Sequence, residues 1–180
     1  EEEGYAGVLI DTVSDSGMRA LRSRLDIPVV GPGEAAFAAA MMLGKKFSVL
    51  TMWPEWFPLY EKTITEYGWW ERVASLRSID TRPDVTELLA GKEEVIFDKL
   101  KAEAMLAIEE DGADVIVLGS TTMHQSAKYL ADNLPIPVLN PGQVAYKFLE
   151  TLIELGLTHS KKAFPAPEVP KDEDIRKGWY

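Results

Sequence analysis

Short apolar runs alternate with amphipathic stretches along most of the chain. The runs predict buried strands at residues 7–10 (GVLI), 27–30 (IPVV), 47–52 (FSVLTM), 72–79, 115–118 (VIVL) and 136–139 (IPVL). The amphipathic stretches predict helices at residues 18–25, 34–43, 55–67, 93–110, 123–130 and 142–155. Strands separated by one helix form βαβ units, and strands covered on both faces are apolar throughout. The pattern therefore predicts an α/β fold with mainly parallel sheets.

The chain also contains an internal repeat. Residues 21–36 match residues 130–145 through a shared Leu-x-Ile-Pro-Val segment and a Pro-Gly turn that follows it. Two related copies predict two similar parallel-sheet α/β halves related by pseudo-two-fold symmetry, with the active site in the cleft between them. The alternative is one continuous sheet without facing loops.

The repeat also gives the expected domain boundaries. We expect residues 1–45 with 141–157 to form the first half, residues 46–140 the second half, and residues 158–180 a C-terminal arm. The arm carries Pro165, Pro167 and Pro170, which prevent a continuous helix. It is either a solvated arm or an arm laid across a neighbouring subunit, and we expect a homo-oligomer.

The first half is shorter than the second. Residues 1–4 (EEEG) match residues 109–112 (EEDG), which end the long helix of the second copy. If the halves are repeats, about 60 residues of βαβα are missing before the first strand, by the length of the intact copy. We therefore expect either that the natural protein is longer or that another chain fills the gap.

Composition limits the partners and cofactors that we expect for this chain. The 19 Lys and Arg residues against 29 Asp and Glu residues give a net charge of −10, which argues against nucleic acid or an anionic membrane as partner. No apolar run is long enough to span a membrane and no signal-peptide pattern opens the chain, so we expect a cytoplasmic protein. With no cysteine and only two histidines, His124 and His159, we expect neither a bound metal nor another cofactor.

Two polar loops are the candidate ligand site. Residues 11–17 (DTVSDSG) follow the first strand, and residues 119–124 (GSTTMH) follow its repeat. Hydroxyl groups and backbone N–H groups at helix N-termini bind small anions such as carboxylates without a basic residue. Simple helix capping by these side chains is the alternative. The candidate ligand-binding residues are Ser14, Asp15, Thr121, Thr122 and, at the end of a third strand, Thr51.

The segments around these loops resemble the Asp/Glu/hydantoin racemase superfamily, most closely its hydantoin racemase branch. The matching segments are residues 7–18 (GVLIDTVSDSGM), 27–36 (IPVVGPGEAA), 47–51 (FSVLT), 113–123 (ADVIVLGSTTM) and 136–145 (IPVLNPGQVA). The resemblance covers about residues 1–155. It implies two α/β halves with the active site between them. It also implies a cofactor-independent reaction in which two cysteines, one from each half, take and return a proton beside a carbonyl.

Both family cysteines are replaced in this chain, because the alignment puts Thr12 and Ser120 at their positions. A thiol titrates near pH 8.5 and can act as a base, whereas an aliphatic hydroxyl needs a neighbouring base to activate it. The two-thiol reaction therefore cannot run here. Asp11, Asp15 and His124 are the candidate proton carriers, and we expect Thr12, Ser120 and His124 to be catalytic.

Two functions follow from the resemblance and the replaced thiols. The first is a cofactor-independent enzyme that acts beside a carboxylate or imide carbonyl of a small acid. It would be a racemase by family, or a decarboxylase or lyase given the missing thiols. The alternative is a non-catalytic protein that binds a small carboxylate or a hydantoin-like ligand on the same fold.

Overall fold

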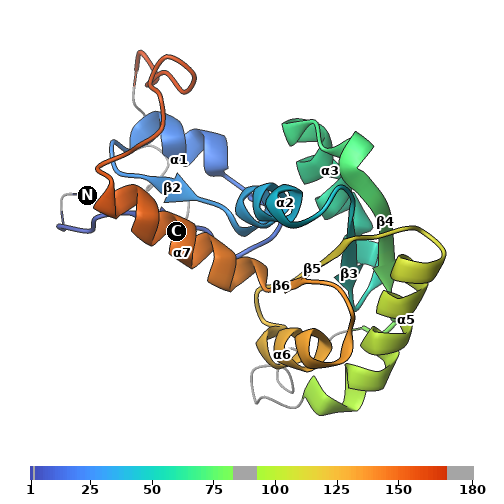
Figure 1. The fold of residues 1–180 in the computed structure, drawn as a ribbon. Helices are drawn as coiled ribbons and strands as arrows, with labels where there is room; N and C mark the ends of the chain where they lie inside the picture. The colour runs from blue at the N-terminus through green and yellow to red at the C-terminus, as the bar shows by residue number, and fades with distance from the viewer. Residues whose placement is uncertain (2, 83–92, 170–180) are drawn as a thin grey trace.

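A computed structural model describes residues 1, 3–82 and 93–169 of the protein and contains two separate parallel sheets (Figure 1). The small sheet pairs β1 (Val8–Leu9) with β2 (Val29–Val30). The large sheet has the strand order β4-β3-β5-β6, with β3 (Phe47–Thr51), β4 (Val73–Ser78), β5 (Val115–Leu118) and β6 (Val138–Leu139). All pairings are parallel, so the predicted α/β class is confirmed. One continuous sheet is wrong for the described residues.

Helices connect the strands close to the predicted positions. They are α1 (Met18–Arg24), α2 (Pro32–Leu43), α3 (Phe57–Tyr67), α5 (Phe97–Glu109), α6 (His124–Asn133) and α7 (Pro141–Glu154). Short 3₁₀ turns occupy η1 (Pro54–Trp56), η2 (Trp70–Arg72) and η3 (Glu93–Ile96). Both α2 and α7 begin at a proline, earlier than predicted, because proline presets the helical φ and lacks an N–H that the first turn leaves unpaired.

Helices cover both faces of the large sheet, so β3 and β5 are buried along their whole length and are mainly apolar, with Ser48 and Thr51 as the polar residues of β3. On one face, Leu50 and Ile116 pack with Leu100 of α5 and Leu130 of α6. The other face packs against α2 and α3 through Phe47, Val49, Val115, Val117, Phe37 and Ile64. This layering fixes the carboxyl ends of β3 and β5 at one edge of the sheet.

The helices that follow β2 and β6 are exchanged between the two sheets. Helix α2 leaves the small sheet and packs on β3 and β5 of the large one, while α7 leaves the large sheet and packs on β1 and β2. The two helices also pack against each other, with Ala35 of α2 and Ala145 of α7 buried together (Figure 1). The proposed halves, residues 1–45 with 141–157 and residues 46–140, therefore share α2 as a common layer.

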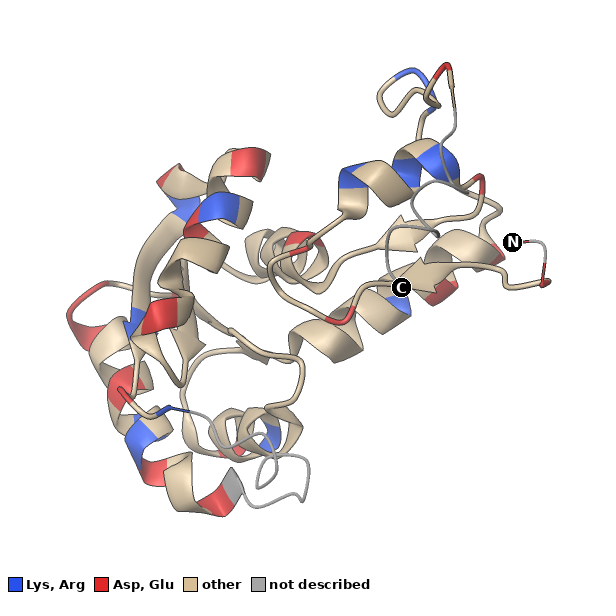
Figure 2. Ribbon diagram, turned by 180° about the vertical axis from the view of Figure 1, so that it is seen from behind, with Lys and Arg blue, Asp and Glu red and all other residues tan. Residues whose placement is uncertain are grey.

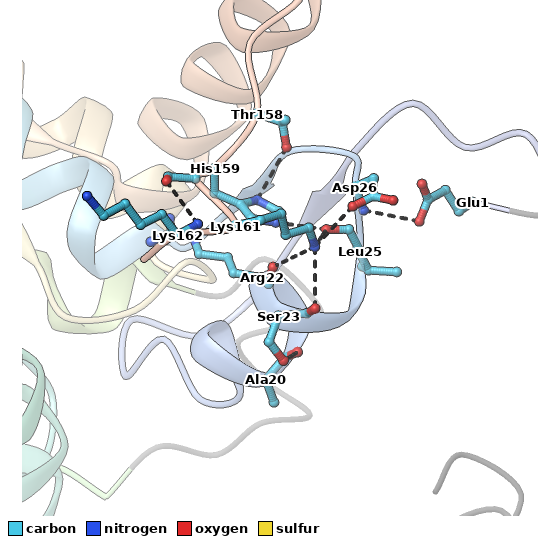
Figure 3. A network of polar contacts seen from close by, with 11 residues as sticks. Glu1, Ala20, Arg22, Ser23, Leu25, Asp26, Thr158, His159, Lys161 and Lys162 are labelled. Atoms are coloured by element: carbon cyan, nitrogen blue, oxygen red, sulfur yellow. Dashed lines mark hydrogen bonds and ion pairs between the residues drawn. The ribbon is translucent and has the colours of Figure 1, made fainter. Parts of the chain in front are cut away.

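The described part of the C-terminal arm lies against α1 of the same chain (Figure 3). The Lys161 ammonium group donates to the carbonyl groups of Arg22, Ser23 and Leu25 at 3.1, 3.3 and 2.6 Å. His159 Nε2 lies 2.8 Å from the Leu25 carbonyl oxygen. Figure 2 shows basic residues along α1 and on the arm. The Lys161 charge is held by the carbonyl groups at the negative end of the α1 dipole and by the carboxylate of Asp26, whose Oδ1 lies 3.1 Å from Lys161 Nζ.

Part of the predicted arm lies outside the described residues, including Pro170 and everything after it. Contact of the arm with a neighbouring subunit stays a prediction, as does the homo-oligomer. Within the described ranges, no helix is long and apolar enough to cross a membrane.

Candidate functional site

The two polar loops face one cleft with a volume of about 300 Å³. Its walls come from the loop after β1, the loop after β5, and the segment of η1 and α3. The lining residues are Asp11, Thr12, Val13, Ser14, Trp56, Leu59, Tyr60, Gly119, Ser120, Thr121 and Thr122. The cleft therefore lies beyond the carboxyl ends of two parallel strands, where open α/β sheets bind their ligands.

A chain of hydroxyl groups holds the first loop together. Thr12 Oγ1 lies 3.0 Å from Ser14 Oγ, and Ser14 Oγ lies 2.8 Å from Ser16 Oγ. The Asp15 N–H group donates to the Thr12 carbonyl at 3.0 Å and closes a tight turn. Because Asp15 has a φ of 49°, the turn passes through the left-handed region, which Asp tolerates better than most residues. The turn leaves the partly exposed Thr12 hydroxyl at the cleft.

The second loop repeats this hydroxyl pair at the matching positions. Ser120 Oγ lies 2.8 Å from Thr122 Oγ1 and also accepts the Thr122 N–H group at 3.3 Å. Two hydroxyl pairs, each formed by residues two apart in the sequence, thus lie on opposite loops of one cleft. They are Thr12 with Ser14 and Ser120 with Thr122. Each pair offers hydrogen-bond donors to a carbonyl or carboxylate oxygen.

Tyr60 supports the second loop from below. Its hydroxyl group donates to the Gly119 carbonyl at 2.7 Å and lies 2.9 Å from Thr51 Oγ1. A Cβ atom at Gly119 would lie 2.5 Å from the Tyr60 hydroxyl oxygen, so the contact requires glycine there. Burial raises the pKa of Tyr60 to about 12, which keeps the phenol protonated and donating at neutral pH. The sequence analysis missed Tyr60, because it reads as one more apolar position of the helix.

Several predicted site residues lie away from the cleft lining. Thr51 is fully buried beneath the loop, where its hydroxyl group contacts Tyr60 instead of the cleft. His124 is the exposed first residue of α6, with Nδ1 3.3 Å from the Thr122 carbonyl oxygen. Asp15 is buried and its carboxylate caps α2. Of the three candidate proton carriers, Asp11 is the one that lines the cleft.

The third wall is apolar. Trp56 and Leu59 line the cleft, and Trp53 packs edge-on against Trp56 with ring centroids 6.2 Å apart. The Arg82 guanidinium carbon lies 5.6 Å from the centre of the Trp53 ring and stabilises this pair from outside. The cleft can thus hold a small ligand with a polar carbonyl edge between the loops and an apolar substituent against Trp56.

The charge in and around the cleft is limited. Asp11 is the acidic lining residue, and the lining contains no Lys, Arg or His side chain among the described residues. The Lys62 ammonium group lies behind the first loop, donating to the Ser14 carbonyl at 3.1 Å. No group of three or more potential metal ligands occurs within the described part of the chain. The hydrogen-bonding side chains of the cleft lining are therefore mainly hydroxyl groups.

Comparison with known proteins adds an independent line of evidence. The sequence pattern of the family described as Asp/Glu/Hydantoin racemase matches residues 1–149. A hydantoin racemase from Pseudomonas sp. (strain NS671) is 36% identical over 169 residues, which cover 93% of this chain and 67% of that protein. A hydantoin racemase from Rhizobium meliloti is 32% identical over 167 residues, covering 89% of this chain and 66% of that protein.

Solved structures that resemble this chain include a racemase and a decarboxylase. The allantoin racemase from Klebsiella pneumoniae superposes with a TM-score of 0.84 at 33% identity, covering 94% of this chain and 68% of that one. An arylmalonate decarboxylase, at 18% identity and a TM-score of 0.61 over 84% of this chain and 70% of that one, shares the fold. The chain thus spans about two thirds of the length of the relatives it matches.

Proposed function

This chain belongs to the Asp/Glu/hydantoin racemase family, and from that premise we propose that it binds a hydantoin-like imide or a small carboxylic acid between its two polar loops. We further propose that it labilises a bond to the carbon beside the carbonyl of that ligand. The observation that carries the proposal is that one cleft is lined by both Thr12 and Ser120, the two positions that the family resemblance assigns to its proton-carrying thiols.

The hydroxyl pairs would stabilise charge on the ligand. When the bond to the α-carbon breaks, its electron pair moves onto the carbonyl oxygen, and preorganised donors lower the energy of that oxyanion. Thr12 and Ser120 come from opposite loops and would flank the two faces of the ligand. Trp56 and Leu59 would hold its substituent and exclude water.

Asp11 is our first choice for the group that moves the proton. Its carboxyl group belongs to the cleft lining, and a carboxylate can take a proton directly or through the neighbouring Thr12 hydroxyl. His124 is our second choice, because its ring would have to turn from the Thr122 carbonyl toward the cleft. In this scheme Ser14, Thr121 and Thr122 bind the ligand, whereas Thr51 acts through Tyr60.

A non-catalytic binding protein is the second candidate function. The specific observation in its favour is that both thiol positions carry hydroxyl groups, so the cleft keeps its hydrogen-bond donors and lacks a matched pair of bases. A decarboxylase or lyase reaction is a variant of the first function, since it needs a carbanion stabilised at the same place and one proton donor.

Proton exchange separates these functions. The protein would be incubated in deuterated water with substituted hydantoins, allantoin, aspartate, glutamate and substituted malonates, and loss of the α-proton would be followed by NMR. Exchange or decarboxylation supports the enzyme. Binding measured by calorimetry without exchange supports the binding protein. Neither binding nor exchange with any of these compounds would refute both.

A further inference from the structure

Asp15 makes a connection that its place in the sequence does not suggest. It lies in the loop before α1, yet its carboxylate serves the N-terminus of α2. Asp15 Oδ1 accepts the Gly33 N–H group at 2.9 Å, and Oδ2 accepts the Glu34 N–H group at 2.6 Å. The residue is 2% exposed. A buried carboxylate thus fastens the Thr12–Ser14 loop to a helix that begins 17 residues later in the sequence.

Two glycines leave the room for this connection. A Cβ atom at Gly31 would overlap with the Asp15 carboxylate, and one at Gly33 would overlap with the Val13 carbonyl oxygen and lie 2.9 Å from Asp15 Oδ2. Both positions therefore exclude a side chain so that the loop can sit directly on the first turn of α2. Any larger residue there would push the loop, and the Thr12 hydroxyl with it, away from its present place.

The second copy of the repeat caps its helix differently. Asn140 stands where the first copy has Gly31, and its Oδ1 accepts the N–H groups of Gly142 and Gln143 at 3.0 and 3.3 Å. The position that matches Asp15 is Met123, which is buried in the core of the large sheet. Helix α7 is thus capped by the residue just before it, whereas the first turn of α2 is capped from the first polar loop. Capping alone does not need a carboxylate from the first polar loop.

We propose that Asp15 is a positioning residue, which holds the first polar loop on α2 so that the Thr12 and Ser14 hydroxyl groups face the cleft. The same residue uses its side chain for α2 and its N–H group for the Thr12 carbonyl, 3.0 Å away, so it joins helix and turn at one point. The loop after β5 takes its support from Tyr60 instead. The catalytic importance of this position rests on the function proposed above.

A matched pair of variants separates positioning from capping. Asp15→Ala (D15A) removes the carboxylate. The double variant D15A/G31N imports the arrangement of the second copy, because the overlap at position 31 disappears with the carboxylate and an asparagine there can cap α2 locally. Both variants carry the same alanine in the left-handed region, so their comparison isolates the cap. Asp15→Asn is the conservative variant, which keeps one accepting oxygen.

The primary readout is amide hydrogen exchange by NMR, which needs no ligand. In D15A, the amides of residues 33 and 34 and the amide of residue 15 should all exchange at least about tenfold faster, because each group loses its acceptor or its fixed turn. In D15A/G31N, residues 33 and 34 should regain protection, while residue 15 stays fast. Asp15→Asn should keep residue 15 within about threefold of the wild type. Protection of residue 15 that is unchanged in D15A, or restored in the double variant, overturns the proposal.

Ligand binding then tests the link to function. For the hydantoin or acid that the wild type binds, D15A/G31N should weaken binding at least about tenfold and Asp15→Asn by less. Equal affinity of D15A/G31N and wild type would show that the loop position has no bearing on the ligand and would overturn the proposed role. If the wild type binds none of these compounds, the proposed function fails, whereas the exchange result still decides whether Asp15 positions the loop.

Discussion

Replacing Tyr60 by phenylalanine should destabilise the protein and loosen the second loop at the same time. The change removes one hydroxyl group that donates to the Gly119 carbonyl at 2.7 Å and contacts Thr51 Oγ1 at 2.9 Å. The ring itself remains, so the packing against Ile64 and Val117 in the core is kept. Of the two partners, Gly119 lines the cleft and Thr51 is fully buried beneath it.

The expected cost follows from the two partners left behind. A buried polar group without its hydrogen bond costs about 1–3 kcal/mol. With the Gly119 carbonyl and the Thr51 hydroxyl both affected, Tyr60→Phe should lower the free energy of unfolding by about 2–4 kcal/mol. Adding Thr51→Val removes one of the stranded groups, so the double variant should recover about 1 kcal/mol relative to the sum of the two single variants.

Urea unfolding at 25 °C, followed by tryptophan fluorescence, measures all four proteins of this cycle. Thr51→Val alone is the matched control, because it removes the same pair contact from the other side. Ligand affinity should fall in Tyr60→Phe, since the Gly119 carbonyl that precedes Ser120 is no longer held. If Tyr60→Phe lowered the free energy of unfolding by less than about 0.5 kcal/mol, the argument that the Tyr60 hydroxyl group supports the loop would be contradicted. Strict additivity in the cycle would contradict the contact between Tyr60 and Thr51.

Three further results are expected. The double change Thr12→Cys with Ser120→Cys should raise the rate of α-proton exchange on a hydantoin or acidic amino acid by at least about tenfold, because thiols titrate far closer to neutrality than hydroxyl groups. An unchanged rate with every compound would show that the pocket itself has diverged. Burial raises the pKa of Asp15 from its ordinary value of 3.8 to about 6, so the folded state binds this proton more tightly than the unfolded state. The contribution of this proton to the free energy of unfolding is therefore complete below about pH 4 and is lost as the pH rises through 6, by up to about 3 kcal/mol. If the free energy of unfolding of the wild type and of Asp15→Asn changed in parallel between about pH 4 and 7, this shift in pKa would be contradicted. Lys161→Met should cost about 1 kcal/mol in urea unfolding, because it removes the contacts with the end of α1 and the ion pair with Asp26. The loss should be smaller for the control Lys162→Met, and equal losses would contradict a specific role for these Lys161 contacts.

The fold could be predicted from the sequence because its signals are local. Each strand, such as β5, is a short apolar run between polar loops, and parallel strands buried on both faces must look like that. The predicted helix boundaries are less exact, because 3₁₀ turns, which a sequence pattern does not separate from an α-helix, directly precede α3 and α5. The exchange of α2 and α7 between the sheets has no local signal.

The candidate site could be predicted in part. The internal repeat predicts two matching polar loops, and the structure brings both to one cleft, with Thr12 and Ser120 in its lining. Tyr60 and Leu59 were missed, since a helical position beside a cleft has the same pattern as one beside the core. The role of Asp15 could not be inferred either, because its partners at positions 33 and 34 are backbone N–H groups, which every sequence has and no sequence pattern distinguishes.

The exchanged helices have a consequence for how the protein unfolds. Each sheet packs against a helix that follows a strand of the other sheet, and these two helices pack against each other through Ala35 and Ala145. Separating α2 from β3 and β5 would expose Phe37 and Phe47, a stacked pair with ring centroids 4.8 Å apart, and would also remove the contact between Ala35 of α2 and Ala145 of α7. We therefore expect the described residues to unfold as one cooperative unit, with the most slowly exchanging amides of both sheets opening in the same global event.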